Sequence, residues 1–380
     1  MNKDVVKLLK NEELIRSQHP YWIWESIHEI PEMLSACMAE DQTAAVHQAA
    51  AACAKKELET IYLLGRGSSY FLTLAGKPLL EHLTGIPSFS SVTNVFAAYQ
   101  MELINSSSLV ILNSHSGKTG EDLDIIRQAK ELGATTMAVT DYEDSPLGEI
   151  VDFVLTGPGG AKVELPATRS YATTLYLLHK FSTALARKTK AATSASSYDS
   201  ALAKLPNQIG ERMEKAEAVC KIAAEKLSGS SSYIVIGYGP NYATADEAAL
   251  SISQSTAVPA FSFELENFIH GPIQALTPTQ TVICIAPDGA LQDRMLRTMR
   301  AVSTIGAKTV LLAPEDQTGL PSSDVKIDLP AGVPELVSPL AAMVPLWQFA
   351  YQLALLGGGG HPDRLAMDRP EFQEAFTHLM

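Results

Sequence analysis

Short apolar runs alternate with helical patterns along most of the chain. The runs IYLL at 61–64, LVIL at 109–112 and TMAV at 136–139 predict strands, because runs of this length bounded by turn residues are typical of buried parallel strands. A Gly/Ser turn and a helix from about Tyr70 follow the first run, and a Ser-rich turn and a helix over about 119–132 follow the second. This strand–turn–helix order predicts an α/β fold with helices on both faces of a parallel sheet.

Other helical patterns lie outside these strands. Residues 3–18 and 40–56 predict helices, with Trp22, Trp24 and Pro31 in the segment between them. A further long helical pattern covers about 201–228. The polar stretch KTKAATSASSYDS at 188–200 predicts a linker, and the tail that begins with four glycines at Gly357 predicts a loop that folds over a site.

The strand–turn–helix pattern occurs twice. Three motifs of the first half return about 172 residues later: Gly65-x-Gly67-x-x-Tyr70 as Gly237-x-Gly239-x-x-Tyr242, Val110-Ile111 with Gly117 as Val282-Ile283 with Gly289, and Leu132-Gly133-Ala134 as Ile305-Gly306-Ala307 with one residue of slip. Three matches at nearly one offset indicate two copies of one α/β unit.

Charge and cysteine content narrow the possible partners. The 29 basic and 42 acidic residues give a net charge of −13, which repels nucleic acid and anionic membrane, so neither is expected as a partner. The four cysteines show no metal spacing and predict free thiols in a reducing compartment, without a metal or cofactor. The charged N-terminus does not resemble a signal peptide, and no uncharged window of 18 apolar residues is expected, so we predict a cytoplasmic location without a membrane span.

The segment NSHSGKT at 113–119 carries the strongest chemical pattern. It follows a predicted strand and precedes a predicted helix, and it places hydroxyls at Ser114, Ser116 and Thr119 beside the free N–H groups of that helix. A helix cap alone needs one hydroxyl, so three of them favour a phosphate site. In the second copy the equivalent residues are Ala-Pro-Asp at 286–288, which lack the hydroxyls and add a negative charge. The sequence therefore predicts that only the first half binds phosphate.

The turn GRGSSY at 65–70 adds Ser68 and Ser69 at the carboxyl end of the first predicted strand, where open α/β sheets place ligands. A dinucleotide fold is disfavoured, because Tyr70 stands where the third glycine of GxGxxG is needed. The P-loop pattern is also absent from the sequence.

These motifs resemble the SIS (sugar isomerase) domain family. SHSGKTGED is similar to the family's SQSGETADT, GRGSSY to its GxGTS turn, and ATRSYATT to STKAFTTQ; in the second half, GYGPNYATADEAAL resembles GRGPQYPTALEGAL and ENFIHGPIQAL resembles GELKHGPLALI. The resemblance covers most of residues 40–355. It extends to the isomerase half of glucosamine-6-phosphate synthase and to stand-alone phosphosugar isomerases, deaminases and deglycases. Residue 2 is Asn, without the cysteine of a glutaminase domain, so amidotransfer from glutamine is not expected.

The resemblance implies a fold and a set of domains. We expect two tandem SIS-type units, each a flavodoxin-like, three-layer arrangement of a parallel sheet between helices. Residues 1–39 would be a helical extension, 40–190 the phosphosugar-binding domain, 200–356 the second domain and 357–380 a tail covering the site.

The resemblance also implies roles for particular residues. Ser68, Ser69, Ser114, His115, Ser116 and Thr119 would hold the sugar phosphate. His270 would open the sugar ring, reaching the site from the neighbouring subunit of a homodimer. The family's catalytic glutamate, sixteen residues before that histidine, is here Gln254, which cannot accept a proton as a carboxylate can.

Several residues remain open as replacements for that glutamate. Glu247 lies two turns earlier on the same face of the predicted helix, although it also matches the structural glutamate of ALEGAL, and Glu264 and Glu266 are further candidates. The family's C-terminal lysine is unmatched, with His361, Arg364 and Arg369 in its neighbourhood.

Two classes of function follow from these residues. The first is an enzyme that acts on a 6-phosphorylated ketose or amino sugar by ring opening and proton transfer at C1–C2, as an isomerase, a deaminase or a fructosamine-6-phosphate deglycase. The second is a non-catalytic phosphosugar sensor, which the acidic balance disfavours because such proteins usually carry a basic DNA-binding helix.

Overall fold

The computed structural model describes residues 16–159, 164, 166–188, 192–357, 361–363, 371, 374–375 and 378. The chain forms two compact units. The first unit comprises residues 30–162 and 169–207, and the second unit comprises 1–29, 163–168 and 208–380. Each unit contains one five-stranded parallel sheet, as the repeated motifs predicted.

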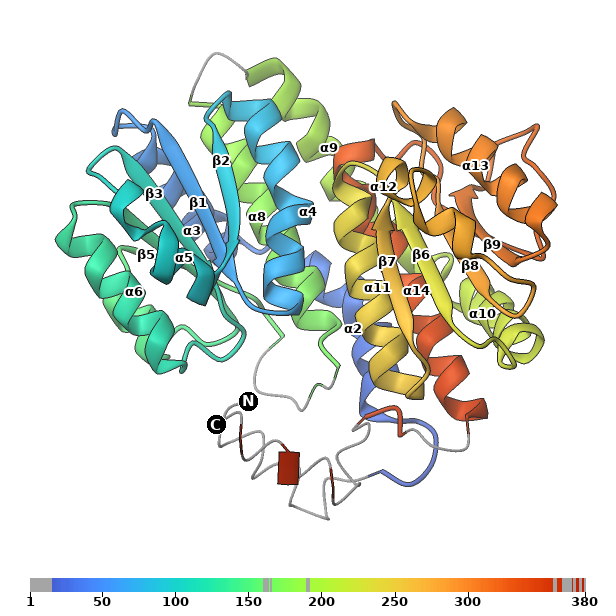
Figure 1. The fold of residues 1–380 in the computed structure, drawn as a ribbon. Helices are drawn as coiled ribbons and strands as arrows, with labels where there is room; N and C mark the ends of the chain where they lie inside the picture. Colours follow the sequence, from blue (N-terminus) through green and yellow to red (C-terminus); the bar gives the residue numbers. More distant parts are fainter. Residues whose placement is uncertain are drawn as a thin grey trace. The chain divides into compact units, whose positions relative to one another are not determined.

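The sheet of the first unit contains β1 (Thr60–Gly65), β2 (Ser88–Val92), β3 (Ser108–Asn113), β4 (Thr135–Thr140) and β5 (Phe153–Thr156). The strands are parallel in the order β2-β1-β3-β4-β5 (Figure 1). The central strands β1, β3 and β4 are the three that the apolar runs predicted. The chain turns in opposite directions after β1 and after β3, so the order is flavodoxin-like and reverses between these two strands.

Helices cover both faces of this sheet in three layers (Figure 1). On one face, Phe96 of α5 (Thr93–Tyr99), Ile125 and Ile126 of α6 (Gly120–Glu131) and Leu147 of α7 (Pro146–Ile150) form a buried cluster with Val110 and other strand residues. On the opposite face lie α3 (Glu40–Cys53), α4 (Ser68–Thr84) and α8 (Arg169–Ala186). The 3₁₀ turn Met101–Leu103 follows α5, and its Met101 packs against the buried cluster on the first face.

The sheet of the second unit has the same order, with β7 (Ala260–Glu264), β6 (Tyr233–Gly237), β8 (Thr281–Ile285), β9 (Lys308–Pro314) and β10 (Val325–Leu329) side by side. Its helices are α10 (Met213–Leu227), α11 (Pro240–Thr256), α12 (Leu265–Ile269), α13 (Gln292–Ile305) and α14 (Ser338–Leu356), with 3₁₀ turns at Pro272–Ala275 and Glu335–Val337. The three-layer unit therefore occurs twice, which confirms the predicted fold class.

Two glycines show how closely the two units correspond. Gly67 precedes α4 with φ 53° and ψ −129°, and Gly239 precedes α11 with φ 52° and ψ −131°. Both values of φ lie in the left-handed region that residues with a Cβ avoid. The GxG motif therefore recurs because both strand-to-helix turns need this conformation.

The N-terminal elements differ from the sequence prediction. The predicted helix over 3–18 lies mostly outside the described residues, and Arg16–Gln18 are not helical. The next segment forms helix α2 (Trp22–Ala36), which no pattern had predicted. Ile23, Ile27, Ile30 and Leu34 recur at helical spacing and are all at most 1% exposed, so burial of this apolar stripe outweighs the internal Pro31.

The predicted linker is also partly helical. Residues 192–200 begin helix α9 (Ala192–Gly210), so the helix expected over 201–228 is two helices, α9 and α10. Asp199 of α9 holds this segment against α8, because its carboxylate lies 2.8 Å from Lys180 and 2.6 Å from Arg187 and accepts a hydrogen bond from Thr183. Long-range ion pairs of this kind leave no local pattern in the sequence.

The expectation that no uncharged apolar window exists is wrong. Among the described residues, the stretch Glu335–Leu356 is long and apolar enough to cross a membrane, with a mean hydropathy of 1.3. However, 89% of that window is buried inside the fold, as is usual for a core helix. The four cysteines are all buried and unpaired, as predicted.

Candidate functional site

The predicted phosphate-binding residues lie in two neighbouring turns at the carboxyl edge of the first sheet. Ser68 and Ser69 are the first residues of α4 after β1, and Ser114, Ser116 and Thr119 lie between β3 and α6. Since β1 and β3 are paired and parallel, both turns lie at the point where the strand order reverses, which is where open α/β sheets bind their ligands. The N-termini of α4 and α6 therefore lie at the same edge of the sheet as these hydroxyls.

Gly117 sets the path of the Ser-rich loop. Its φ of 60° is left-handed, and its carbonyl accepts a hydrogen bond of 3.0 Å from the N–H of Leu147. A Cβ at this position would collide with the side chain of Ser145, which caps α7. The loop that carries Ser114, Ser116 and Thr119 is therefore fixed by tertiary contacts and by a residue that must be glycine.

The charges around the two turns largely balance one another. Arg66, in the β1–α4 turn, forms ion pairs of 2.7 Å with Glu121 and 3.0 Å with Asp122, both in the first turn of α6. Burial raises the pKa of Asp122, an effect that Arg66 opposes. With Lys118, these four side chains sum to zero, and Asp141 beside His115 adds one negative charge at the same edge of the sheet.

His115 belongs to a different arrangement from the serines around it. Its Nδ1 lies 2.7 Å from Oδ2 of Asp141, a residue directly after β4 whose side chain is 2% exposed, whereas the His115 side chain is 41% exposed. The His115 carbonyl accepts hydrogen bonds from the Thr140 hydroxyl at 3.1 Å and the Asp141 N–H at 3.2 Å. The imidazole is thus fixed by a buried carboxylate while part of it faces solvent.

In the second unit a carboxylate of the chain itself lies where the first unit presents hydroxyls. Oε2 of Glu335 accepts a 3.0 Å hydrogen bond from the N–H of Ala290, and a Cβ added to Gly289 would collide with the Glu335 side chain. Asp288 is exposed beside it. This turn already holds an anion, which supports the prediction that only the first half binds phosphate.

The predicted catalytic residues of the second unit are dispersed. His270 follows α12, its side chain is 77% exposed, and its Nε2 lies 3.6 Å from Glu266. Glu266 in turn pairs with Arg294 at 2.7 Å, which lowers the pKa of Glu266, and Glu264 accepts hydrogen bonds from two N–H groups at the start of α12. Both carboxylates therefore have structural partners.

Glu247 and Gln254 share a helix but not an environment. Glu247 is fully buried in the middle of α11, whereas Gln254 is exposed two residues before the helix ends. Because α11 runs back from the carboxyl end of β6 to the amino end of β7, Gln254 lies at the opposite edge of the sheet from His270. Within this unit the structure does not bring His270 and Gln254 together.

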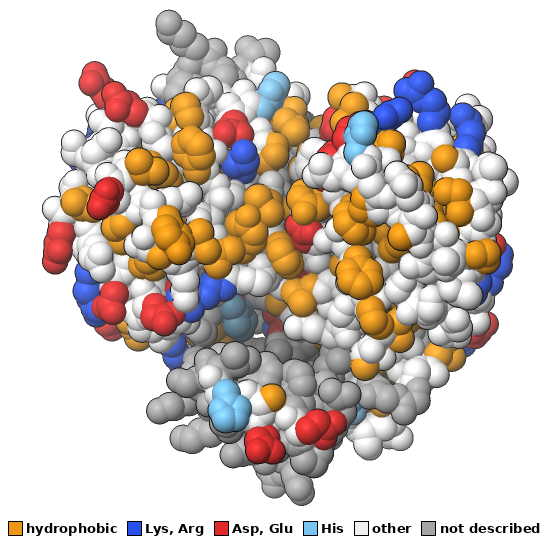
Figure 2. Space-filling view, in the orientation of Figure 1, with side chains coloured by type: hydrophobic (Ala, Val, Ile, Leu, Met, Phe, Trp, Pro, Cys, Tyr) orange, Lys and Arg blue, Asp and Glu red, His pale blue; other side chains and the backbone are white. Residues whose placement is uncertain are grey.

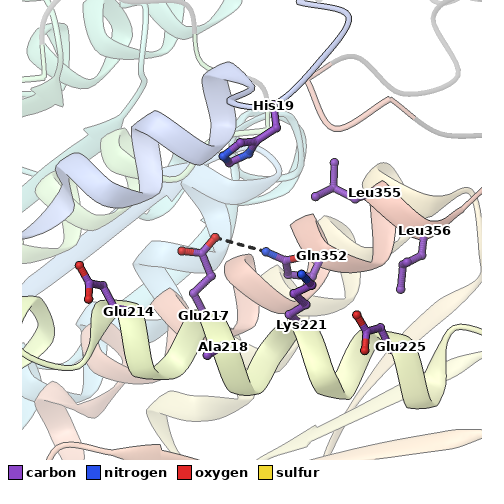
Figure 3. Close-up of a pocket in the computed structure, with 9 residues that line it drawn as sticks. All are labelled: His19, Glu214, Glu217, Ala218, Lys221, Glu225, Gln352, Leu355 and Leu356. Carbon is purple, nitrogen blue, oxygen red and sulfur yellow. Dashed lines mark hydrogen bonds between the residues drawn. The ribbon is translucent and has the colours of Figure 1, made fainter.

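A cavity of about 480 Å³ in the second unit contains none of the predicted site residues. Its lining comes from α10, the end of α14 and His19, and Figure 3 shows Glu217 facing Gln352 across it. The Glu217 carboxylate accepts hydrogen bonds from Trp24 at 2.7 Å and Gln352 at 3.2 Å and lies 3.1 Å from Nε2 of His28. Glu217 therefore attaches α2 to α10 and α14, and we assign it a structural role.

The described part of the C-terminal tail contacts the start of α2. Asp363 accepts hydrogen bonds from the N–H groups of Trp22 and Ile23 at 3.0 and 2.9 Å, and His361 bonds to the carbonyl of Arg16 at 2.7 Å. Arg364 and Arg369 lie outside the described residues. Coverage of the site by residues 357–380 therefore stays a prediction.

Asp141 and Arg66 also lie at the candidate site, although no pattern in the sequence had predicted them there. Asp141 directly follows β4, so the rule that ligands bind at the carboxyl ends of parallel strands could have pointed to it. Arg66 lies inside the GRGSSY motif, but its partners Glu121 and Asp122 become neighbours only through the pairing of β1 with β3.

Comparison with known proteins agrees with this architecture. The SIS domain family model matches residues 55–184. Glutamine–fructose-6-phosphate aminotransferase (isomerizing) of Gloeobacter violaceus is 27% identical over 344 residues, which are 89% of this chain and 56% of that protein. The chain thus spans about half the length of the curated relatives it matches.

Two solved structures share the fold at low sequence identity. The C-terminal domain of glucosamine-fructose-6-phosphate aminotransferase from Francisella tularensis has a TM-score of 0.80 at 19% identity, covering 90% of this chain and 97% of that one. Tagatose-6-phosphate ketose/aldose isomerase from Escherichia coli has a TM-score of 0.75 at 18% identity, covering 92% and 96%. The chain therefore contains an SIS domain at residues 55–184, and its second unit repeats the same fold.

Proposed function

We propose that this protein is an enzyme of phosphosugar metabolism that acts on a 6-phosphorylated ketose or amino sugar. Its substrate would be anchored by the phosphate at the carboxyl ends of β1 and β3, opened to its linear form and then altered by proton transfer at C1–C2. The outcome would be aldose–ketose isomerisation, release of ammonia, or release of an amino acid from a fructosamine 6-phosphate.

The observation that carries this proposal is the difference between the two units at equivalent turns. The first unit presents Ser68, Ser114 and Ser116 beside helix N-termini, whereas the second unit fills the turn with the carboxylate of Glu335. A duplicated fold that keeps one anion site open favours an anionic ligand. The names of the similar proteins, which refer to fructose 6-phosphate and tagatose 6-phosphate, favour a sugar phosphate as that ligand.

Proton NMR in D₂O tests the proposal directly. The purified chain is incubated separately with fructose 6-phosphate, glucosamine 6-phosphate and a fructose–amino-acid 6-phosphate. We expect at least one of them to form product or to lose its C1 or C2 proton signal, and the product identifies the reaction. Absence of binding to all three, seen as unchanged line widths, would refute the proposal.

A phosphosugar sensor is the second candidate, and Gln254 is the observation that favours it. An amide at the position of the family's catalytic glutamate cannot accept a proton from carbon. For a sensor, we expect the NMR signals of all three ligands to broaden on binding, and none of the ligands to be converted or to lose its C1 or C2 proton over a day of incubation.

We further propose that the chain forms a homodimer in which His270 completes the site of the neighbouring subunit. His270 is 77% exposed in its own unit. Apolar side chains also reach the surface on the edge strands, where Phe89 of β2 is 53% exposed and Phe261 of β7 is 52% exposed; Figure 2 shows hydrophobic side chains on the visible surface of both units. Sedimentation equilibrium should give twice the chain mass of 40.9 kDa, and a monomer at micromolar concentration would contradict the proposal.

A further inference from the structure

The strongest unexplained feature is the pair formed by His115 and Asp141. The two side chains come from the ends of adjacent parallel strands, β3 and β4, and meet at 2.7 Å. A phosphate ligand explains the serines on either side of His115, since hydroxyls bind phosphate without further help. It does not explain why the histidine between them is bonded to a carboxylate that is 2% exposed.

We propose that His115, oriented by Asp141, is the proton-transfer group at C1–C2 and supplies the basicity that Gln254 lacks. This inference rests on the proposed function. His115 would be the catalytic residue, because its ring reaches the substrate, and Asp141 a positioning residue that acts through the ring.

The geometry is that of an imidazole prepared for proton transfer. With Nδ1 donating its hydrogen to Asp141, the neutral ring carries its lone pair on Nε2. When Nε2 accepts a proton the ring becomes an imidazolium, which the buried carboxylate stabilises, since the attraction between opposite charges strengthens as water is excluded. Asp141 thus fixes the tautomer before the transfer and stabilises the charge after it.

The surroundings keep the ring in place. Its backbone carbonyl accepts two hydrogen bonds, from Thr140 and Asp141, and the ring of Tyr142 lies edge-on with its centroid 5.9 Å from the imidazole. Lys118, in the same loop, lies 6.0 Å from the Tyr142 ring centroid. Because the histidine projects from the middle of the loop that would hold the phosphate, its ring is within reach of the carbons of a sugar anchored there.

The step balances without a further reactant. In the open-chain aldose, the C2–H bond breaks, its proton forms a bond to Nε2, and the electron pair of the C–H bond becomes the C1–C2 double bond of an enediol as the carbonyl oxygen takes up a proton. The Nε2 proton then bonds to C1 while the O2 hydroxyl releases its proton and forms the C2 carbonyl; solvent water carries the proton lost from O2 and the proton gained by O1, so the two cancel. The product is the ketose with a neutral imidazole, and the reverse sequence gives the aldose.

The experiment compares His115→Gln with the unmodified chain. Glutamine fits the loop, because the resembling family motif SQSGETADT carries it there, and His115 is exposed, so the fold should be kept. For whichever of the three phosphosugars is turned over, we expect kcat and the rate of C–H to C–D exchange to fall at least about 100-fold. The dissociation constant of that sugar, measured by calorimetry, should change less than about threefold.

Two further variants make the result specific. Asp141→Asn should lower kcat in the unmodified chain but cause no further loss in the His115→Gln background, because it acts through the ring. His47→Gln, which changes an exposed histidine on α3, is the matched control and should leave kcat unchanged. Additive losses for His115 and Asp141 would show that the two residues act separately and would overturn the assignment.

The remaining outcomes separate this inference from the proposed function. If His115→Gln turns over substrate at the unmodified rate, or loses affinity with kcat unchanged, the histidine is a phosphate contact at most; the inference then fails while the proposed function stands. If the unmodified chain binds phosphosugars without exchanging C1 or C2 protons, the inference fails and the sensor function replaces the enzyme. If it binds none, both fail.

Discussion

The left-handed conformation of Gly117 makes the Ser-rich loop sensitive to a single methyl group. Gly117→Ala places a Cβ at φ 60°, against the side chain of Ser145 and 3.3 Å from the Cβ of Leu147. Gly120, three residues later and the first residue of α6, has no atom within 4 Å of an added Cβ and no left-handed φ. The two glycines therefore form a matched pair within one loop.

The cost of Gly117→Ala follows from two contributions. A non-glycine residue in the left-handed region costs about 1–2 kcal/mol. Displacement of Ser145 costs about 1–2 kcal/mol more, because Ser145 caps α7 by accepting a 3.2 Å hydrogen bond from the N–H of Gly148. We expect Gly117→Ala to lower the free energy of unfolding of the first unit by about 2–4 kcal/mol, and Gly120→Ala to change it by less than about 1 kcal/mol, in the stabilising direction.

Hydrogen exchange measured by mass spectrometry on peptides covering β3 and β4 provides the assay. Tryptophan fluorescence would not serve, because Trp22, Trp24 and Trp347 all belong to the second unit. A loss of 2–4 kcal/mol accelerates the exchange of amides that open by unfolding by roughly 30- to 1000-fold, since about 1.4 kcal/mol corresponds to a factor of ten. Equal exchange rates for the Gly117→Ala and Gly120→Ala variants would refute the reasoning.

Three further predictions concern stability. His179 is fully buried, and its ring nitrogens have no hydrogen-bond partner among the described residues. Burial lowers the pKa of His179 to about 3, below the usual 6.5. The stability contributed by the neutral ring is therefore present above pH 6.5 and is lost as the pH falls toward 3. The free energy of unfolding, measured in urea, should fall between pH 7 and pH 5 by about 2 kcal/mol less in the His179→Leu variant than in the unmodified chain. An equal fall in both proteins would contradict the burial argument. Asp199→Asn should lower the free energy of unfolding by about 1–3 kcal/mol, because it breaks a half-buried ion pair with Lys180. Urea unfolding followed by circular dichroism measures this change, and a loss below about 0.5 kcal/mol would contradict the role given to this pair. Glu335→Ala should lower the free energy of unfolding of the second unit by about 1 kcal/mol, measured by urea unfolding followed by tryptophan fluorescence. An unchanged free energy of unfolding would mean that the hydrogen bond to Ala290 does not stabilise the fold.

The parts of the fold that the sequence predicted are those with strong local patterns. β1, β3 and β4 are buried on both faces and read as continuous apolar runs, and the repeated glycine motifs fixed the duplication. The edge strands β2 and β5 were missed because they are short and only partly buried, with Ser-rich or mixed sequences. Their strand structure depends on pairing with β1 and β4, which no local window contains.

The candidate site also contains residues that a local pattern predicts and residues that only tertiary contacts bring together. Ser114, Ser116 and Thr119 could be predicted because they follow one another within a single turn. The partnership of His115 with Asp141 could not, since it joins residues 26 positions apart through the pairing of β3 with β4. Local sequence thus predicted candidate binding groups, and tertiary structure was needed to find the group that the proposed chemistry uses.

The two units show how a duplicated turn can acquire two different uses. The turn between β3 and α6 in the first unit corresponds to the turn between β8 and α13 in the second, and both lie at the carboxyl edge of a parallel sheet, where a helix N-terminus offers N–H groups. Donors of this kind need an acceptor, because a polar group left without a partner away from water costs about 1–3 kcal/mol. In the second unit Glu335 is that acceptor within the chain itself, and the turn is complete without a ligand. In the first unit the corresponding N–H, that of Lys118, bonds to the Ser116 hydroxyl at 3.4 Å, so a side-chain hydroxyl stands where the second unit has a carboxylate. The proposal that an anion from outside the chain binds beside these hydroxyls follows from this difference.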